Sequence, residues 1–128
     1  MSVTHPKLAF TDKRGTITDI LVHEPIDSVV FIKSSKGAIR GNHYHKQTFQ
    51  WTYILSGIVK VASYIPDGPK TCTIEQTVSA GDLIMHIPNE RHAFLALEDS
   101  EWVVLTRGPR GGQDYESDTF RLATPLLK

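Results

Sequence analysis

The sequence has little of what disulfide-rich, nucleic-acid-binding or membrane-spanning proteins need. Its one cysteine, Cys72, excludes a disulfide within the chain. Lys plus Arg and Asp plus Glu both number 14, so the formal net charge of +0 gives no long-range attraction to nucleic acid or to an anionic lipid surface. No apolar run approaches the roughly 20 residues that cross a bilayer, and residues 1–6 lack a signal-peptide pattern. We expect a cytoplasmic protein with no nucleic-acid and no membrane partner.

The chain length fits one domain. A chain of 128 residues buries a real hydrophobic core but is too short for two ordinary domains. The composition changes only at 107–112, where the last apolar segment gives way to a polar C-terminal tail, residues 108–128. We expect a single domain over 1–128, with the tail wrapped around it or around a partner subunit.

Short apolar segments alternate with turns along the whole sequence. Turn-forming Gly, Pro, Asn, Asp and Ser recur at close intervals, and the segments between them are rich in β-branched and aromatic residues. The clearest segments are 28–32, 51–55, 58–65, 83–87 and 102–106. Many short strands and no helix-length segment predict an all-β antiparallel sandwich or barrel. Cys72 fits such a strand as a small buried thiol, and we assign it no role.

The strongest local signal is the run Arg40-Gly41-Asn42-His43-Tyr44-His45. Residues two apart on a strand point to the same face, so His43 and His45 are predicted to lie side by side. A hairpin after them returns Gln50 to the same space, and a turn at 88–91 brings in His92 from a distant part of the chain. We predict that three imidazoles and one amide converge inside the barrel.

These residues resemble the two sequence motifs of the cupin superfamily. The first motif, a glycine, His-x-His, a glutamate and a second glycine, falls on Gly37, His43, His45, Gln50 and Gly57, and the second falls on Gly81, Pro88 and His92. Gln50 departs from the usual glutamate, and Asn89 and Ala96 depart from a usual glycine and asparagine. Both motifs in order across residues 37–96 are more specific than either alone. The resemblance implies a single-domain antiparallel jelly-roll β-barrel.

The segment 40–46 is similar to that of sugar-nucleotide cupins, namely dTDP-4-keto-6-deoxyhexose 3,4-ketoisomerases and capsular-polysaccharide cupin domains. This finer resemblance implies a small sugar or sugar-nucleotide ligand and an isomerase or epimerase that moves a proton next to a ketone. His43 and His45 are then the catalytic candidates. Arg40 would stabilise the oxygen of the enolate. A non-catalytic binder of small molecules and a metal-dependent oxygenase are the alternatives.

The same side chains also suit a metal ion. Imidazoles and an amide oxygen bind Zn, Fe, Mn or Ni, which makes His43, His45, Gln50 and His92 a candidate set of ligands. Without a metal, His43 and His45 would move protons, since an imidazole pKa near 6.5 suits acid–base chemistry at neutral pH. We favour the divalent transition metal, because three histidines and an amide are predicted to meet.

A sugar nucleotide also needs cations for its diphosphate and an aromatic face for its base or sugar. Arg40 is the first candidate, and the further candidates are Arg91, Arg107, Arg110, Tyr53, Trp102 and Trp51. We expect His86 to be a hydrogen-bonded residue of the barrel wall. Asp114 and Tyr115 in the tail would close over the barrel mouth or, as we prefer, pack on its outside. Apolar outward positions favour a homodimer.

Overall fold

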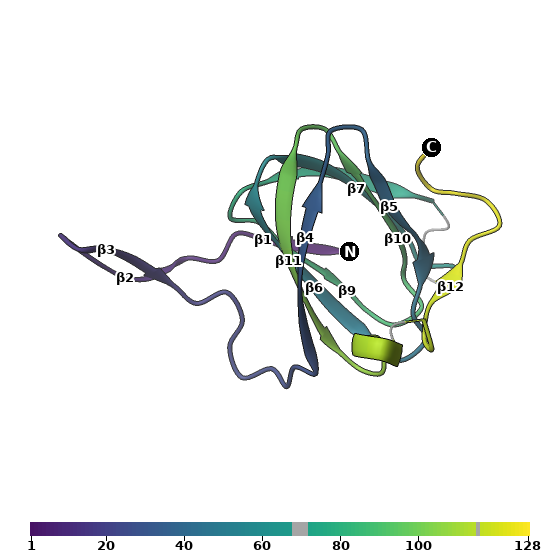
Figure 1. The fold of residues 1–128 in the computed structure, drawn as a ribbon, viewed down its shortest axis with the longest axis horizontal. Helices are drawn as coiled ribbons and strands as arrows, with labels where there is room; N and C mark the ends of the chain where they lie inside the picture. Colours follow the sequence, from purple (N-terminus) through teal and green to yellow (C-terminus); the bar gives the residue numbers. More distant parts are fainter. Residues whose placement is uncertain (68–71, 115) are drawn as a thin grey trace.

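Two antiparallel five-stranded sheets pack face to face in the computed structural model, which describes residues 1–67, 72–114 and 116–128 (Figure 1). The first sheet has the order β1-β9-β6-β11-β4, with bounds Ser2–Thr4, Leu83–His86, Phe49–Ser56, Ser100–Arg107 and Ser28–Ser34. The second has the order β12-β5-β10-β7-β8, with bounds Phe120–Arg121, Ile39–Tyr44, Arg91–Ala96, Ile58–Tyr64 and Ile74–Ser79. The predicted all-β, jelly-roll barrel is confirmed.

Alternation of side chains along each strand builds the core between the sheets. In β11, Trp102, Val104 and Thr106 are buried and point inward, while the residues between them are only half-buried. The central cluster consists of Ile54, Val59, Val61, Val78, Ile84, Phe94 and Trp102. Burying each such large side chain stabilises the fold by about 1.5–3 kcal/mol. The buried histidines His86 and His92 adjoin this cluster at Phe94, with ring centroids 5.7 and 6.0 Å from the phenyl ring.

The predicted strand segments correspond to β4, β6, β7, β9 and β11. We expected Cys72 to be a buried strand residue. It is exposed and lies in a bend just before β8, which begins at Ile74. The buried-thiol interpretation is therefore wrong. In the part of the chain that the structure describes, no helix has the length and apolar character for a membrane crossing.

A β-hairpin of β2 (Leu8–Asp12) and β3 (Gly15–Thr18) projects from the barrel as an arm (Figure 1). Within the described residues these two strands pair only with each other, and every residue of β2 is exposed. Nothing in the sequence analysis predicted the arm.

The C-terminal tail runs along the outside of the second sheet. After the 3-10 turn η1 (Gly112–Asp114), β12 pairs with β5, and the side chain of Asn42 binds the main chain of Leu126 and Leu127. Tyr115 and the side chain of Asp114 lie outside the described part of the chain, so their predicted placement stays a prediction.

Candidate active site

A bulge in strand β5 sets the direction of the His43 side chain. Gly41 and Asn42 both have positive φ, 86° and 55°. The pairing with β10 skips Asn42, so His92 opposes His43 and Ala93 opposes Gly41. A Cβ on Gly41 would lie 2.9 Å from the carbonyl oxygen of His92, so only glycine allows this close approach. The bulge turns Asn42 outward to the tail and His43 inward.

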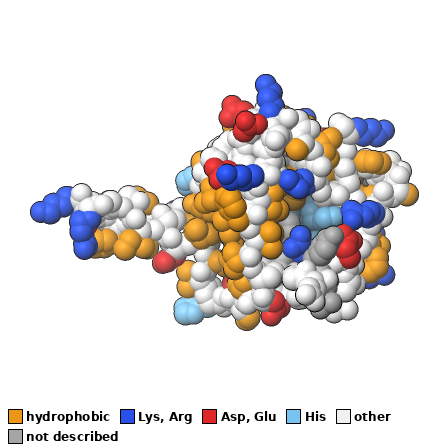
Figure 2. Space-filling view, in the orientation of Figure 1, with side chains coloured by type: hydrophobic (Ala, Val, Ile, Leu, Met, Phe, Trp, Pro, Cys, Tyr) orange, Lys and Arg blue, Asp and Glu red, His pale blue; other side chains and the backbone are white. Residues whose placement is uncertain are grey.

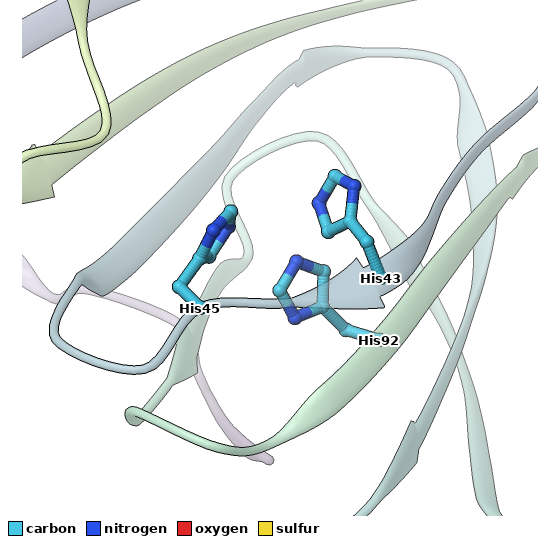
Figure 3. Close-up of side chains that lie close together, drawn as sticks. All are labelled: His43, His45 and His92. Carbon is cyan, nitrogen blue, oxygen red and sulfur yellow. The ribbon is translucent and has the colours of Figure 1, made fainter. Parts of the chain in front are cut away.

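Three imidazoles meet inside the barrel, from β5, from the loop after it and from β10 (Figure 3). The ring centroids of His43 and His45 are 4.9 Å apart, those of His43 and His92 are 4.8 Å apart, and those of His45 and His92 are 5.2 Å apart. One nitrogen of each ring lies within 4.8 Å of the others. The predicted convergence of these three side chains is thus present in the structure.

Main-chain carbonyls fix the tautomers of two of these rings. Nδ1 of His45 lies 2.8 Å from the carbonyl oxygen of Asp118, and Nδ1 of His92 lies 3.0 Å from that of Glu90. A carbonyl oxygen only accepts, so both Nδ1 atoms carry the hydrogen and both Nε2 atoms are bare. Neither Nε2 atom meets hydrogen-bond geometry with a described residue, although the Gln50 side chain lies close enough to His45 to raise its pKa. The cluster therefore offers two buried nitrogen lone pairs.

All three imidazoles are neutral at physiological pH. Burial, together with the positive charges of neighbours that include Arg110 and Arg121, lowers the pKa of His43 to about 3. Burial also lowers the pKa of His45, and burial and the neighbouring histidines bring the pKa of His92 well below its usual range. A neutral imidazole is the form that accepts a proton.

His43 faces a cavity of about 180 Å³ between the two sheets. The cavity is lined by Ile32, Arg40, Gly41, His43, Gln50, Thr52, Phe94, Trp102, Val104 and Arg110. The guanidinium of Arg40 donates to Ser34 Oγ at 2.8 Å and to the carbonyl of Lys33 at 2.9 Å, which holds it at the edge of the cavity. Arg40, Gln50 and Trp102 thus line the same cavity as His43.

Four other residues that we predicted to contact the ligand do not line this cavity: Tyr53, Trp51, Arg91 and Arg107. Tyr53 and Trp51 alternate with the inward-facing Gln50 and Thr52, so they point to the outer face of the first sheet. The guanidinium of Arg91 stacks on Tyr44, with its central carbon 3.8 Å from the ring centroid, on the outside of the second sheet. Arg107 donates to Glu24 at 2.6 Å. Tyr53 in particular is not part of this cavity, because a strand sends adjacent side chains to opposite faces.

The structure places His86 differently from the expectation. His86 is buried at 1% exposure and stacks on His92 with centroids 4.6 Å apart, yet neither of its nitrogens has a hydrogen-bond partner among the described residues. The expectation of a hydrogen-bonded wall residue is therefore wrong. The sequence does not show which residues of β9 face the barrel interior. His86 faces inward because it pairs with the inward-facing Gln50 of the neighbouring strand β6.

The two residues whose carbonyls bind the histidine rings, Glu90 and Asp118, also have buried carboxylates. Glu90 accepts hydrogen bonds from Ser63 Oγ and from the main-chain N–H of Ile87, and Asp118 accepts three from the loop between β5 and β6. No spacing or motif pointed to Asp118, because its partners lie some 70 residues upstream.

The fold and the two histidine motifs agree with comparison to known families. The model of the cupin family matches residues 6–127, and the chain belongs to this family. Among curated proteins, no sequence matches the chain at a significant level.

Solved structures of sugar-nucleotide enzymes are similar to this chain. The QdtA 3,4-ketoisomerase of Thermoanaerobacterium thermosaccharolyticum, a double mutant in complex with TDP, is 27% identical over 94% of this chain and 86% of its own, with a TM-score of 0.71. The dTDP-4-dehydrorhamnose 3,5-epimerase of Sulfolobus tokodaii is 19% identical over 91% of this chain and 73% of its own, with a TM-score of 0.75. A 3,5-epimerase of Legionella pneumophila, in complex with dTDP-4-keto-L-rhamnose, is 19% identical over 98% and 78%, with a TM-score of 0.71. The predicted resemblance to sugar-nucleotide cupins is confirmed, and these neighbours support the expectation of an enzyme of that kind.

The expectation of a bound Zn, Fe, Mn or Ni ion on the three histidines and Gln50 is wrong. The similar structures are epimerases and ketoisomerases of a kind that acts without a metal cofactor, and a histidine cluster suits their proton transfer equally well. The charges also disfavour a cation, because Arg110 and Arg121 already repel positive charge at His43, and Gln50 brings no negative charge where the family has a glutamate. The metal-dependent oxygenase depended on that ion and is dropped with it.

Proposed function

We propose that this protein is a sugar-nucleotide isomerase that moves a proton between the carbons next to a ketone, as in the 3,4-isomerisation of a 4-keto-6-deoxyhexose carried on a nucleoside diphosphate. The observation that supports it most is a neutral imidazole, His43, on the wall of a cavity that Arg40 and Arg110 also line. The similarity to a 3,4-ketoisomerase at 27% identity supports this reaction over epimerisation.

His43 is the proposed base, since it alone of the three clustered imidazoles lines the cavity. It takes the proton from carbon 3, and the electrons of the broken C–H bond form the C3–C4 double bond of an enediolate. Carbon 4 then receives a proton from the histidine. The hydroxyl hydrogen leaves the oxygen on carbon 3 as the new carbonyl forms, and the oxygen on carbon 4 gains one. Atoms and charge balance with no oxidant, reductant or metal.

We propose that the two arginines of the cavity, Arg40 and Arg110, stabilise negative charge on the substrate. The guanidinium of Arg40 has five N–H donors, and two of its hydrogen bonds hold it at the edge of the cavity. The remaining donors can stabilise the enediolate oxygen or bind the diphosphate. A diphosphate near Arg110 also cancels part of the positive charge that lowers the pKa of His43, so substrate binding makes His43 a stronger base.

The cavity volume of about 180 Å³ suits one hexose ring and is too small for a whole sugar nucleotide. We therefore place the sugar against Trp102 and His43, with the diphosphate and the base at the arginine side, outside the barrel. Tyr53 has no part in this arrangement.

Incubation with TDP-4-keto-6-deoxyglucose, followed by NMR of the sugar carbons, tests the proposal. We expect a 3-keto product. A 3,5-epimer as the product would replace isomerisation by epimerisation, and tight binding without any change of the sugar would leave a non-catalytic binder.

We also propose a cytoplasmic homodimer. Two cross-strand rows of apolar side chains lie on the outer face of the first sheet, and they consist of Val29, Leu105, Trp51 and Met85, and of Phe31, Val103, Tyr53 and Leu83. Trp51 and Leu83 are buried within one copy, and the most exposed members of the rows lie on β4. Val29 is 65% exposed and Phe31 53% exposed. Figure 2 shows apolar side chains gathered over this part of the barrel and along the arm. The free Cys72 suits a reducing compartment.

A second copy of the chain is the occupant that we propose for this face. The arm exposes Leu8, Phe10 and Ile17, each by more than half, and in the described part of its own copy it pairs with no barrel strand. An isolated two-stranded hairpin is marginally stable in water. A two-fold dimer would cover both apolar surfaces at once, with the arm of each copy laid on the sheet of the other.

A further inference from the structure

Asp118 connects the C-terminal tail to the loop that carries His45. It is 3% exposed, although the two residues before it in the tail are exposed. Oδ1 accepts the N–H of Lys46 at 2.9 Å, and Oδ2 accepts the N–H of Gln47 at 3.0 Å and the hydroxyl of Thr48 at 2.8 Å. The main-chain oxygen of the same residue accepts Nδ1 of His45 at 2.8 Å. One tail residue thus holds four consecutive residues of the loop.

We propose that Asp118 is a positioning residue of the active site: its carboxylate holds its own carbonyl against His45, which keeps the hydrogen of that ring on Nδ1 and leaves Nε2 as an acceptor. The inference rests on the proposed function, since it assigns His45 a fixed proton state beside the base His43. Asp118 is not among the residues that line the cavity, so it acts through His45.

The carboxylate is what keeps the carbonyl in place. Burial alone raises the pKa of the Asp118 carboxyl, but the hydrogen bonds from Thr48, Gln47 and Lys46 outweigh it, so the pKa lies below its usual range and the group is ionised. Hydrogen bonds to an ionised acceptor are roughly twice as strong as neutral ones. The tail residues just before Asp118 are exposed, and this buried carboxylate is their anchor on the loop.

The tautomer of His45 matters because its ring lies beside His43, with centroids 4.9 Å apart (Figure 3). When His43 takes a proton from the substrate it becomes a cation. A bare Nε2 on His45 directs a lone pair into the cluster and stabilises that cation, whereas an Nε2–H would direct a positive hydrogen into it. His92 has its hydrogen on Nδ1 through the carbonyl of Glu90, so the two supporting rings have the same tautomer.

Side-chain 15N–1H NMR of the histidines reads the tautomer directly in the free protein, without any substrate. We expect wild-type His45 as the Nδ1–H form and Asp118→Ala as a mixture of both tautomers. Glu116→Ala is the matched control, since among the described residues this carboxylate in the same tail segment pairs with Arg121 at the surface and with no residue of the loop that carries His45. The control is expected to keep the wild-type pattern.

Kinetics give the second measurement. Because displaced catalytic groups cost about 100-fold in rate, we expect Asp118→Ala to lower kcat by about 10- to 100-fold with KM nearly unchanged, and Glu116→Ala to change neither. A folded Asp118→Ala protein with the wild-type tautomer of His45 would overturn the inference, whatever its kcat.

If Asp118→Ala does not fold, Thr48→Val is used for the same NMR measurement. It removes one of the three hydrogen bonds to the carboxylate and keeps the side-chain shape, and Thr48→Ser retains the hydroxyl. We expect a shifted tautomer balance in the valine variant and none in the serine variant. An unshifted valine variant contradicts the inference. A wild-type protein that leaves 4-keto sugars unchanged refutes the proposed function alone, since the NMR assay needs no turnover.

Discussion

His43 and His92 are register partners on the neighbouring strands β5 and β10, and their rings meet edge to face with centroids 4.8 Å apart. The two cupin motifs thus meet in a single cross-strand pair. The bulge beside this pair lets the strands approach, because Gly41 has no side chain to strike the carbonyl of His92.

Gly41→Ala is therefore expected to disturb both stability and activity. Its Cβ would lie 2.9 Å from the carbonyl oxygen of His92 and 3.2 Å from Cα of Ala93, at a φ of +86°. Gly37→Ala is the matched control, with a φ of +88° but open space around the added atom. A left-handed backbone costs alanine about 1–2 kcal/mol at either position. Urea unfolding should show a larger loss for Gly41→Ala, and only this variant should lose kcat. Equal losses would mean that the close approach is unimportant.

The pH dependence of kcat/KM follows from the low pKa of His43. Burial and neighbouring positive charge lower this pKa to about 3, and the neutral ring is the active base. The rate should therefore be flat between pH 5 and 8 and should fall only in more acidic solution, where the ring gains a proton. Steady-state kinetics across this range check the prediction. An acidic limb with a midpoint near 6.5, the value of an unperturbed histidine, would contradict it.

His86→Phe should stabilise the protein. The substitution keeps the stack on His92 and removes two buried nitrogens that have no hydrogen-bond partner among the described residues. Each such group costs about 1–3 kcal/mol, so the two together predict a gain of at least about 2 kcal/mol in the free energy of unfolding at pH 7.

The gain from His86→Phe should grow in acid. Burial lowers the pKa of folded His86 to about 4, so between 6.5 and 4 the unfolded chain binds a proton that the folded protein does not. Wild-type stability falls with falling pH across this window, and at pH 5 the single residue accounts for about 2 kcal/mol. Urea unfolding at pH 7 and pH 5 measures both values. A pH-independent difference for His86→Phe would count against the assigned burial.

The proposed homodimer predicts that charge on either apolar surface dissociates it. Phe31→Asp on the sheet and Phe10→Asp on the arm should both elute as monomers in light-scattering chromatography, since a buried unpaired carboxylate is costly. Thr16→Asp, on the arm at a position that pairs with Thr11, is the control and should stay dimeric. A wild-type chain that is monomeric at all concentrations would refute the dimer.

The histidine site was accessible to sequence reasoning because its geometry is local or follows from strand periodicity. His43 and His45 are two residues apart, and Gln50 returns through a short hairpin. His92 followed from the second motif. These relations need no knowledge of how the tail folds.

The remaining features depend on tertiary contacts that leave no pattern in the sequence. Asp118 acts through main-chain N–H groups, which every residue but proline has, so its partners cannot be read from residue types. The side of β9 that His86 faces depends on pairing with β6, and a one-residue shift in register would turn it outward. The metal expectation failed for a different reason, because a set of imidazoles suits both cation binding and proton transfer.

The role of His43 is tested most directly by deuterium exchange. Wild-type protein and His43→Gln, incubated with TDP-4-keto-6-deoxyglucose in D₂O, are compared by NMR for deuterium at the carbon next to the ketone. We expect incorporation with wild-type protein and a rate at least about 100-fold lower with the variant, because acid–base catalysis contributes about 100- to 10,000-fold. Equal incorporation in both proteins would show that His43 does not move the proton.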